Sequence, residues 1–378
     1  MKTYDVAIVG SGPSGAATAF YLAQKGIRVC IIEKETLPRY KTCGGGFVFR
    51  GRKNLPIDIS SVIEQEYYDV ETYFGKEAFT ISRKDPVITM IMRDTFDHLI
   101  VKEAKKHGID LLENHKLIGV EHDNETVICK TNQGNIHAKF LIAADGVLSQ
   151  TAKFAGWTKE TRNLIPALEY EVTVSKEDFE RLSKKARFDI DAAPEGYAWC
   201  FPKKNHLSLG VLTTRKKRIN LKDYYKQYLE TLGIKEVLKE EQHGFQIPLS
   251  ARTDGFVKGR VFLIGDAAGF AEPITAEGIS NAIYSGKLVA EAIIESNLDL
   301  VKASLLYEEK LHVKLVPELR SGEFLANYFY KRNPVRNFLV KRYAQKFGEY
   351  MVDILMGDKS FPIDVKKKLA QKIKEAVF

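Results

Sequence analysis

The sequence contains few cysteines, and their spacing excludes the usual metal and dithiol sites. Four occur in 378 residues, at Cys30, Cys43, Cys129 and Cys200, without a CxxC pair or a histidine spacing typical of zinc binding. The chain also lacks the roughly 18 consecutive apolar residues that a membrane-spanning helix needs. Its N-terminal segment has no long apolar stretch followed by a cleavage site, as a secretory signal would have. We therefore expect a reduced, cytoplasmic protein without a metal ion.

The sequence also has no acidic excess, and its positive charge is concentrated near one end. It carries 57 Lys and Arg against 49 Asp and Glu, a net charge of +8. The region 311–378 contributes +7 of this, with 14 basic and 7 acidic residues. A basic, aromatic-bearing region is typical of contact with an anionic membrane surface, although a solvated helical face has the same composition. Because no zinc-finger, RNP or heptad pattern accompanies the charge, we expect no nucleic-acid partner.

The spacing of apolar residues predicts a protein of the α/β class. Apolar runs at residues 4–10 and 28–33 flank an alanine-rich segment at 13–25, which predicts a strand–helix–strand unit with a right-handed crossover. Between residues 166 and 249 polar and apolar residues alternate, which predicts an antiparallel sheet with one helix near 221–238. Further strands are predicted at 127–131, 136–143, 168–174, 207–214 and 259–265, and helices at 94–107, at 277–295 and in a tail broken at Pro334 and Pro362.

A glycine-rich turn between the first strand and the first helix predicts a dinucleotide site. Gly10, Gly12 and Gly15 form a GxGxxG pattern. The first glycine permits the tight turn, the second lets a pyrophosphate approach the backbone, and the third lets the helix pack on the strand. Pro13 and Ser14 begin the helix, whose N-terminal N–H groups would face the phosphates.

Three acidic residues indicate which dinucleotide binds. Glu33, followed by Lys34, ends the second strand, where its carboxylate would accept hydrogen bonds from the adenosine ribose and disfavour the 2′-phosphate of NADP. Gly265 and Asp266 end a later strand, and in flavoproteins an aspartate at this place hydrogen-bonds the ribityl chain. Asp145 lies in an Asp-Gly pair between them in the chain. The order of GxGxxG, DG and GD resembles the FAD-binding pattern of the para-hydroxybenzoate hydroxylase superfamily, so we expect FAD.

Further motifs narrow the resemblance to one family. PRYKTCGGG at 38–46 and PEGYAWCFP at 194–202 resemble the KxCGGG and PxxYxWxFP motifs of the geranylgeranyl reductase family. RDTFD at 93–97 resembles the family's RxxFD segment, and the match at 265–286 is close, although Ala276 stands where many relatives have glycine. The resemblance implies a FAD enzyme that saturates carbon–carbon double bonds of isoprenoid chains.

The resemblance also implies roles for particular residues. It would place the thiol of Cys43 near the reactive face of the flavin, where it would tune the ring or assist proton delivery; a structural loop thiol is the alternative. Cofactor contacts are expected from Cys43, Gly44, Gly45, Arg93, Gly278 and Ile279.

Three aromatic residues alternate along one predicted strand. Tyr197, Trp199 and Phe201 would share one face of that strand, with Ala198 and Cys200 on the other. We expect the three to line a substrate cavity, with Tyr197 and Trp199 at the reacting atoms, although ordinary sheet core gives the same pattern.

The predicted protein has a Rossmann-type FAD-binding domain with a parallel sheet, interleaved with an antiparallel-sheet substrate domain and followed by a basic helical C-terminal region. The predicted boundaries are 1–60, 92–160 and 252–310 for the first, 61–91 and 161–251 for the second, and 311–378 for the third.

The predicted reaction is hydride transfer from reduced FAD to an isoprenoid lipid or a prenylated small molecule. Because there is no second GxGxxG, we expect NADPH, NADH or ferredoxin to dock transiently as the electron donor. The basic C-terminal region suits peripheral contact with the inner face of the membrane. The alternative is a class A flavin monooxygenase, either an aromatic hydroxylase or halogenase-like, although YAWCFP departs from the halogenase WxWxIP motif. A non-catalytic redox sensor is a third possibility.

Overall fold

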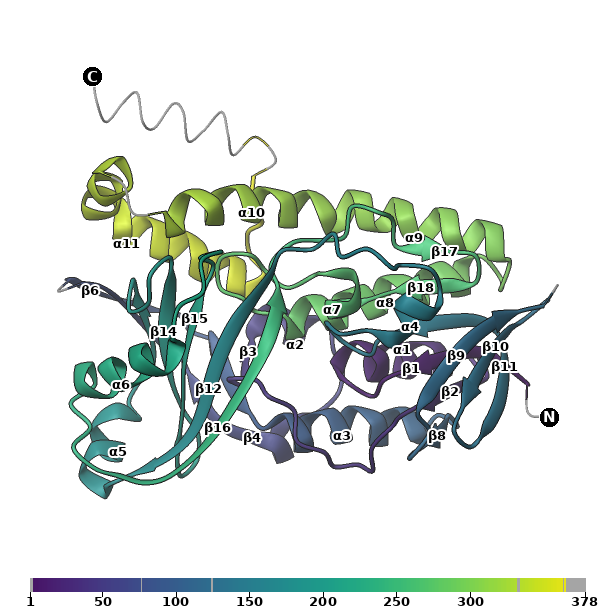
Figure 1. Ribbon diagram of the computed structural model, residues 1–378, viewed down its shortest axis with the longest axis horizontal. Coiled ribbons are helices and arrows are strands. Elements are labelled where there is room, and N and C mark those ends of the chain that lie inside the picture. Colours follow the sequence, from purple (N-terminus) through teal and green to yellow (C-terminus); the bar gives the residue numbers. More distant parts are fainter. Residues whose placement is uncertain (1–2, 76, 124, 332–333, 363, 365–378) are drawn as a thin grey trace.

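The computed structural model describes residues 3–75, 77–123, 125–331, 334–362 and 364. The chain forms an eight-stranded sheet, a seven-stranded sheet and a small three-stranded sheet. Figure 1 shows the eight-stranded sheet at the right and the seven-stranded sheet at the left, with two long C-terminal helices along the top. The α/β class predicted from the sequence is confirmed.

The eight-stranded sheet is built on parallel strands, as its apolar runs predict. Its main order is β17-β18-β11-β1-β2-β8, with β10 and β9 added as an antiparallel ribbon beside β11. The pairings of β1 with β2, β1 with β11, β2 with β8 and β11 with β18 are parallel. The strands are β1 (Thr3–Val9), β2 (Val29–Ile32), β8 (Asp110–Leu112), β9 (Leu117–His122), β10 (Val127–Thr131), β11 (Gly134–Ala143), β17 (Val257–Lys258) and β18 (Val261–Leu263).

Three helices pack together beside this sheet. α1 (Pro13–Ala23) contacts both α3 (Arg93–Lys105) and α8 (Ile279–Glu295). The crossing of α1 and α8 is close, because a methyl group added to Gly286 would lie 2.6 Å from the Ser14 carbonyl oxygen. Small residues in both helices therefore bring their N-terminal ends to the same place.

The seven-stranded sheet has the order β16-β12-β15-β14-β13-β5-β6. All its pairings are antiparallel except that of β13 with β5. The strands are β5 (Asp69–Phe74), β6 (Glu77–Ser82), β12 (Leu164–Val174), β13 (Ala186–Ile190), β14 (Gly196–Pro202), β15 (Leu207–Thr213) and β16 (Val237–Pro248). The smaller elements are β3 (Gly46–Val48), β4 (Ile63–Tyr67), β7 (Ile88–Ile91), α2 (Phe49–Lys53), a 3-10 turn (Ser60–Val62), α4 (Gln150–Phe154), α5 (Lys176–Leu182), α6 (Leu221–Thr231) and α7 (Gly265–Ala268).

One predicted helix ends earlier than expected, and one predicted break between helices is present. The helix expected at 221–238 is too long, because α6 ends at Thr231 and β16 begins at Val237 to pair with β12. The break expected at Pro334 is confirmed, because α10 (Val316–Tyr330) ends before it and a new helix, α11 (Pro334–Met356), begins at this proline. Proline is tolerated there because the first helical N–H groups have no helical partner. Pro362 lies beyond that helix.

The C-terminal region is part of the packed structure over most of its described length. α9 (Leu300–Lys314) and α10 (Val316–Tyr330) contact each other, and α11 contacts β6 and α2. Phe329 packs edge-to-face on Phe74, and the Tyr330 ring stacks with that of Tyr197, so these aromatic residues face the protein core. Residues 365–378 lie outside the described residues, and within the described ranges no helix is long and apolar enough to cross a bilayer. The predicted domain boundaries stay predictions.

Candidate active site

A cavity of about 840 Å³ lies between the two larger sheets and gathers nearly all the predicted site residues. Gly15 and Gly265 lie behind its lining. A methyl group on Gly15 would be 2.1 Å from the Gly10 carbonyl oxygen, and one on Gly265 would be 3.0 Å from the Ser14 hydroxyl. The predicted residues that line the cavity are Gly10, Gly12, Pro13, Ser14, Glu33, Lys34, Cys43, Gly44, Gly45, Arg93, Asp145, Tyr197, Trp199, Phe201, Asp266, Gly278 and Ile279.

The glycine turn presents bare backbone to the cavity. Gly10 has a φ of +102°, and a methyl group there would lie 2.5 Å from the Ala144 carbonyl oxygen, so only glycine fits. Gly12 precedes α1 without a side-chain hydrogen bond to cap it. The free N–H groups at the start of α1 therefore face the cavity and suit a pyrophosphate.

Two arginines stand beside this turn, held by one buried aspartate. Asp97 is fully buried and binds Arg93 through two hydrogen bonds of 2.8 and 2.9 Å and Arg39 through one of 3.1 Å. A methyl group on Gly12 would lie 3.8 Å from one Arg93 nitrogen and 3.9 Å from one Arg39 nitrogen. Arg39, which our site prediction omitted, therefore belongs to the same anion site. Its position in the PRYKTCGGG segment was the available signal.

Glu33 is a buried carboxylate in the cavity lining, where the sequence predicts the adenosine ribose. It accepts hydrogen bonds from the Ser11 N–H at 3.0 Å, the Ser11 hydroxyl at 2.5 Å and the Glu35 N–H at 3.0 Å. These bonds fix the carboxylate beside the glycine turn, where it lines the cavity.

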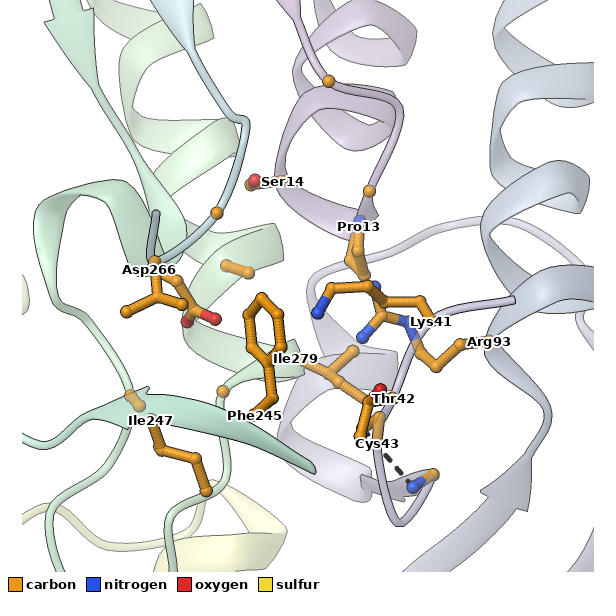
Figure 2. A pocket seen from close by; sticks show the side chains of 18 of the residues that line it. Pro13, Ser14, Lys41, Thr42, Cys43, Arg93, Phe245, Ile247, Asp266 and Ile279 are labelled. Carbon is orange, nitrogen blue, oxygen red and sulfur yellow. Dashed lines mark hydrogen bonds between the residues drawn. The ribbon is translucent and has the colours of Figure 1, made fainter. Parts of the chain in front are cut away.

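The two aspartates of the predicted FAD pattern differ in their bonding. The carboxylate of Asp145 accepts hydrogen bonds from the Ser149 hydroxyl at 2.5 Å and from the N–H and hydroxyl of Thr151 at 3.0 and 2.9 Å, so it organises the start of α4. The Asp266 carboxylate makes no hydrogen bond to any described residue. Burial raises its pKa, against the opposing effect of Lys41 and other nearby cations. Asp266 is therefore the aspartate whose oxygens remain available to a ligand (Figure 2).

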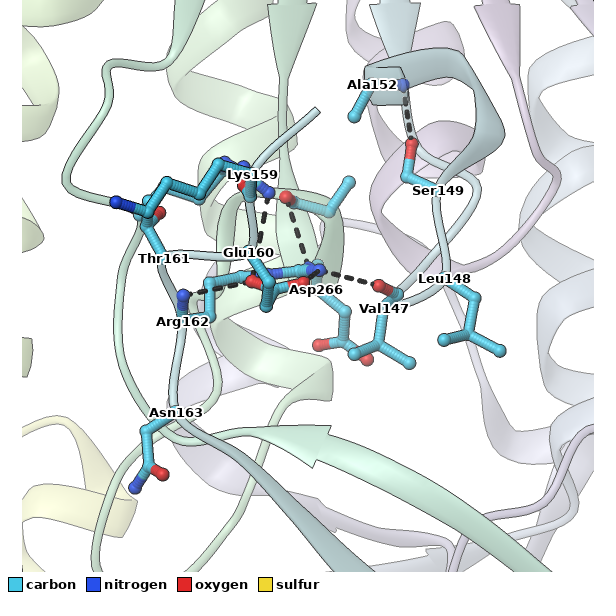
Figure 3. Close-up of polar contacts among 12 residues, drawn as sticks. Val147, Leu148, Ser149, Ala152, Lys159, Glu160, Thr161, Arg162, Asn163 and Asp266 are labelled. Atoms are coloured by element: carbon cyan, nitrogen blue, oxygen red, sulfur yellow. Dashed lines mark hydrogen bonds and ion pairs between the residues drawn. The ribbon is translucent and has the colours of Figure 1, made fainter. Parts of the chain in front are cut away.

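Arg162 holds the two aspartate-bearing loops together. Its guanidinium donates to the carbonyl oxygens of Asp266 at 2.5 Å and Val147 at 2.8 Å, and it binds the Glu160 carboxylate at 2.6 Å (Figure 3). These bonds link the loop after β11 to the start of α7. Arg162 lies outside every motif that we recognised in the sequence.

The three aromatic residues of β14 share one face, as predicted, and we call them the aromatic wall. Tyr197, Trp199 and Phe201 belong to one core cluster, whereas Ala198 and Cys200 belong to another on the opposite face. Trp199 lies directly opposite Gly210 on β15, and a methyl group on this glycine would be 2.0 Å from the indole ring. The indole N–H of Trp199 is buried and has no hydrogen-bond partner in the described part of the chain.

Cys43 lies in a loop that is fixed by a buried lysine. Lys203 donates hydrogen bonds to the carbonyl oxygens of Gly44 at 2.7 Å and Ile91 at 2.9 Å. Gly45 has a φ of +71° in this loop. The thiol of Cys43 accepts a weak hydrogen bond from the Gly45 N–H at 3.4 Å, and Cys43 lies beside Arg93 (Figure 2). The structure thus places the predicted thiol in the cavity, next to a cation.

The cavity lining also includes residues that the site prediction did not name. Lys41 lies 3.7 Å from the centre of the Phe245 ring, and burial lowers its pKa. Glu277 accepts a hydrogen bond of 2.8 Å from the Ser280 N–H at the start of α8, and burial raises its pKa to about 7. Glu169 on β12 is a further buried carboxyl group in the lining. In the sequence it is only one polar residue of an alternating strand.

The arrangement of these groups fits FAD. An anion site with bare backbone and two arginines suits a pyrophosphate, the buried Glu33 suits ribose hydroxyls, and the open Asp266 carboxylate suits a polyol chain. The aromatic wall then offers an apolar surface to a flat ring system.

Comparisons with known proteins agree with this fit. The FAD binding domain family model matches residues 63–297, and the FAD dependent oxidoreductase model matches residues 5–56. The chloroplastic geranylgeranyl diphosphate reductase of Arabidopsis thaliana is 29% identical over 92% of this chain and 80% of its own. The digeranylgeranylglycerophospholipid reductase of Thermoplasma volcanium is 28% identical over 100% of this chain and 98% of its own.

Solved structures share the fold. The crystal structure of a geranylgeranyl bacteriochlorophyll reductase-like protein from Thermoplasma acidophilum superposes with a TM-score of 0.75 and 25% identity, covering 100% of this chain and 96% of that one. A flavin-dependent brominase has a TM-score of 0.73 at 21% identity, covering 99% of each chain, which is a likeness of fold alone. The chain therefore belongs to the FAD-binding domain family and is a FAD-dependent oxidoreductase similar to geranylgeranyl reductases.

Proposed function

We propose that this protein reduces carbon–carbon double bonds of an isoprenoid chain carried by a lipid or a prenylated small molecule. The observation that supports it is a single cavity that joins the charged turn at Gly12 to a large apolar region. An isoprenoid chain needs such a region, because its burial removes apolar surface from water. Besides the aromatic wall, this region is lined by Val48, Ile88, Phe188, Leu212, Ile247 and Leu355.

The aromatic wall would hold the chain and exclude water from the reacting carbons. The Tyr197 hydroxyl donates to the Thr275 carbonyl oxygen, which fixes that ring. Trp199 lies between Tyr197 and Phe201, with ring centres 6.1 and 6.3 Å away. When bound, FAD would supply the hydride. Cys43 would lie close to the reacting centre, beside the guanidinium group of Arg93.

The cofactor would be held by the residues already placed around the cavity. We assign the pyrophosphate to Gly12, Pro13, Ser14 and Arg93, with Gly10 and Gly15 shaping the turn. The adenosine would lie at Glu33 and Lys34, and Asp145 would position its loop. The ring-facing contacts would come from Cys43, Gly44, Gly45, Asp266, Gly278 and Ile279, with Gly265 behind them.

The electron donor would dock transiently, and NADPH, NADH and ferredoxin are the candidates. Peripheral contact of the basic C-terminal region with the inner face of the membrane would bring the protein to its lipid. This contact predicts sedimentation with anionic liposomes at low salt and loss of sedimentation at high salt, because surface charge is screened. Failure to sediment at low salt would remove membrane contact from the proposal.

The direct test is anaerobic. The FAD-loaded protein is photoreduced and mixed with geranylgeranyl lipids that carry no quinone ring, and flavin absorbance and lipid mass are followed together. We expect the flavin to reoxidise as the lipid gains two hydrogens. A saturated lipid of the same length is the matched control and should leave the flavin reduced.

A second result of the same test would contradict the proposed function. Rapid reoxidation by oxygen alone, with hydroxylation or halogenation of an aromatic compound, would identify a class A flavin monooxygenase instead.

A further inference from the structure

The strand pairing of the seven-stranded sheet places a carboxyl group beside the aromatic wall. Trp199 pairs with Gly210, Gly210 pairs with Glu169, and Glu169 pairs with His243, across β14, β15, β12 and β16. Directly paired residues of antiparallel strands point to the same face. Because Gly210 has no side chain, Trp199 and Glu169 are neighbours on the face that lines the cavity.

A second carboxyl group follows on the same face. Glu171 is two residues further along β12, so its side chain leaves the strand on the same face as that of Glu169. We call these two residues the carboxyl pair. Two carboxyl groups at neighbouring positions of one buried face repel each other when both are ionised, which favours a proton on one of them. The pair therefore stores one proton.

The partners of the pair decide where this proton lies. His206 Nε2 is 2.9 Å from a Glu171 oxygen, whereas Glu169 receives hydrogen bonds of 3.3 Å from the hydroxyls of Tyr40 and Ser208. Burial and the charge of Glu171 raise the pKa of Glu169. Burial opposes ionisation of Glu171 as well, but His206 and Lys203 outweigh it and lower its pKa. The proton lies on Glu169, which is the member that lines the cavity.

The pair also has a connection to solvent. Glu169 is only 2% exposed, whereas the side chain of His206 is 18% exposed. His206, Glu171 and Glu169 thus form a path from the protein surface to the cavity. The titratable and charged groups around the pair are Tyr40, Lys203, His206, Glu241 and His243, and Cys43 and Glu64 lie beyond them, near Lys203.

We propose that Glu169 is the catalytic acid of the double-bond reduction, and that Glu171 and His206 return its proton from solvent. This inference rests on the proposed function. Saturation of one double bond adds a hydride to one carbon and a proton to the other. The reduced cofactor provides the hydride with both electrons, and the Glu169 O–H bond breaks to provide the proton. The Glu169 carboxylate is then reprotonated through Glu171 by a proton that His206 takes from water.

The first test needs no turnover. Infrared spectra of the oxidised, FAD-loaded protein are recorded near neutral pH for wild type, Glu169→Gln and the control Glu241→Gln. Glu241 pairs with Glu171 across the strands but is exposed and bound to Lys239, so it should carry no proton. We expect the C=O stretch of a protonated carboxyl group in the wild-type-minus-Glu169→Gln difference and not in the Glu241→Gln difference. Absence of this band from the first difference would overturn the inference.

The second test uses the anaerobic reaction with a prenyl lipid. We expect Glu169→Gln to slow flavin reoxidation by about 10²- to 10⁴-fold with unchanged FAD affinity, which is the usual range for loss of a general acid. Glu171→Gln should leave the first turnover near the wild-type rate and slow the later ones, because only reprotonation is impaired. A Glu169→Gln rate equal to wild type overturns the inference.

Two remaining outcomes are also decisive. If Glu169→Gln no longer binds FAD, the Glu171→Gln variant tests the proton path instead. Equal rates for its first and later turnovers would contradict that path. If the wild-type protein reacts with no prenyl lipid, the proposed function fails, and the infrared band still decides whether Glu169 holds a proton.

Discussion

The two halves of the cavity are built in different ways. The phosphate-facing half uses backbone N–H groups and side chains that follow one another closely, from the turn at Gly10 to Glu33 and Arg39. The apolar half is assembled from separate strands, so that Trp199 and Glu169 meet only through the pairing of both with Gly210. The first half can be recognised in a short stretch of sequence, whereas the second exists only once the strands are in register.

The halves also differ in how they hold charge. Near Gly12, the buried Asp97 carboxylate holds two arginines, and Arg39 also lies 3.8 Å from Glu33. On the apolar side, the carboxyl pair of Glu169 and Glu171 lies near one buried lysine, Lys203. Two arginines beside the glycine turn suit a bound anion, and a carboxyl pair suits storage of a proton.

Among the changes that separate the two halves, removal of the buried Asp97 carboxylate should cause the largest loss of stability. Asp97→Ala leaves Arg39 and Arg93 without their common partner while both stay largely buried. We expect the apoprotein to lose about 3–5 kcal/mol of unfolding free energy, as is usual when one member of a buried ion pair is removed. Chemical denaturation of the apoprotein measures this directly.

The neighbouring acid provides the control. Asp94 lies in the same helical turn, but among the described residues its carboxylate hydrogen-bonds only the N–H of Thr95. Asp94→Ala should lose about 0.3–1 kcal/mol, the usual value for an acid at a helix N-terminus. Equal losses in the two variants would mean that the arginines do not depend on Asp97.

The phosphate-facing half shows how far local sequence carries a prediction. The strand predicted at 127–131 coincides with β10, and the glycine turn lies between β1 and α1 as expected. The turn could be predicted because each glycine has a local reason to be glycine. Arg162 was missed, since its bond to the Asp266 carbonyl oxygen joins residues 104 positions apart.

The apolar half shows where such prediction ends. The alternation of Tyr197, Trp199 and Phe201 predicted a shared face, because side-chain direction along a strand is a local property. The carboxyl pair was not predicted, because strand register decides which residues of β12 stand beside β14. The same limit explains the overlong helix at 221–238: pairing with β12 turns its last residues into β16.

On the apolar side of the cavity, substitution of Gly210 should cause the next largest loss of stability. A methyl group on Gly210 would lie 2.0 Å from the Trp199 ring, so Gly210→Ala must displace the indole. We expect a loss of about 1–3 kcal/mol in unfolding free energy, as for other overpacked cores, together with altered tryptophan fluorescence. Gly119→Ala is the strand control, since its methyl group would only touch Lys130 at 3.6 Å. If both variants are equally stable, the indole does not rest on Gly210.

Glu277 lies where the two halves of the cavity meet, and it should make the stability of the protein depend on pH. Its pKa is raised by burial from 4.5 to about 7, so the folded apoprotein binds this proton more tightly than the unfolded chain. The resulting stability is complete below pH 4.5 and is lost as pH rises through about 7. Glu277→Gln should therefore reduce the fall in unfolding free energy between pH 5 and 8 by about 1–3 kcal/mol. Glu230→Gln, at an exposed position on α6, should leave the pH profile unchanged.

The smallest effect is expected at Ala276, beside Glu277. Its φ is +58°, a left-handed conformation that costs about 1–2 kcal/mol for a residue with a side chain. Ala276→Gly removes this strain but adds about 0.4–1 kcal/mol of unfolded-state freedom. We therefore expect a net gain in unfolding free energy of between zero and about 1.6 kcal/mol. Ala155→Gly, outside the left-handed region, should instead destabilise, and two losses of equal size would show that the strain at Ala276 is absent.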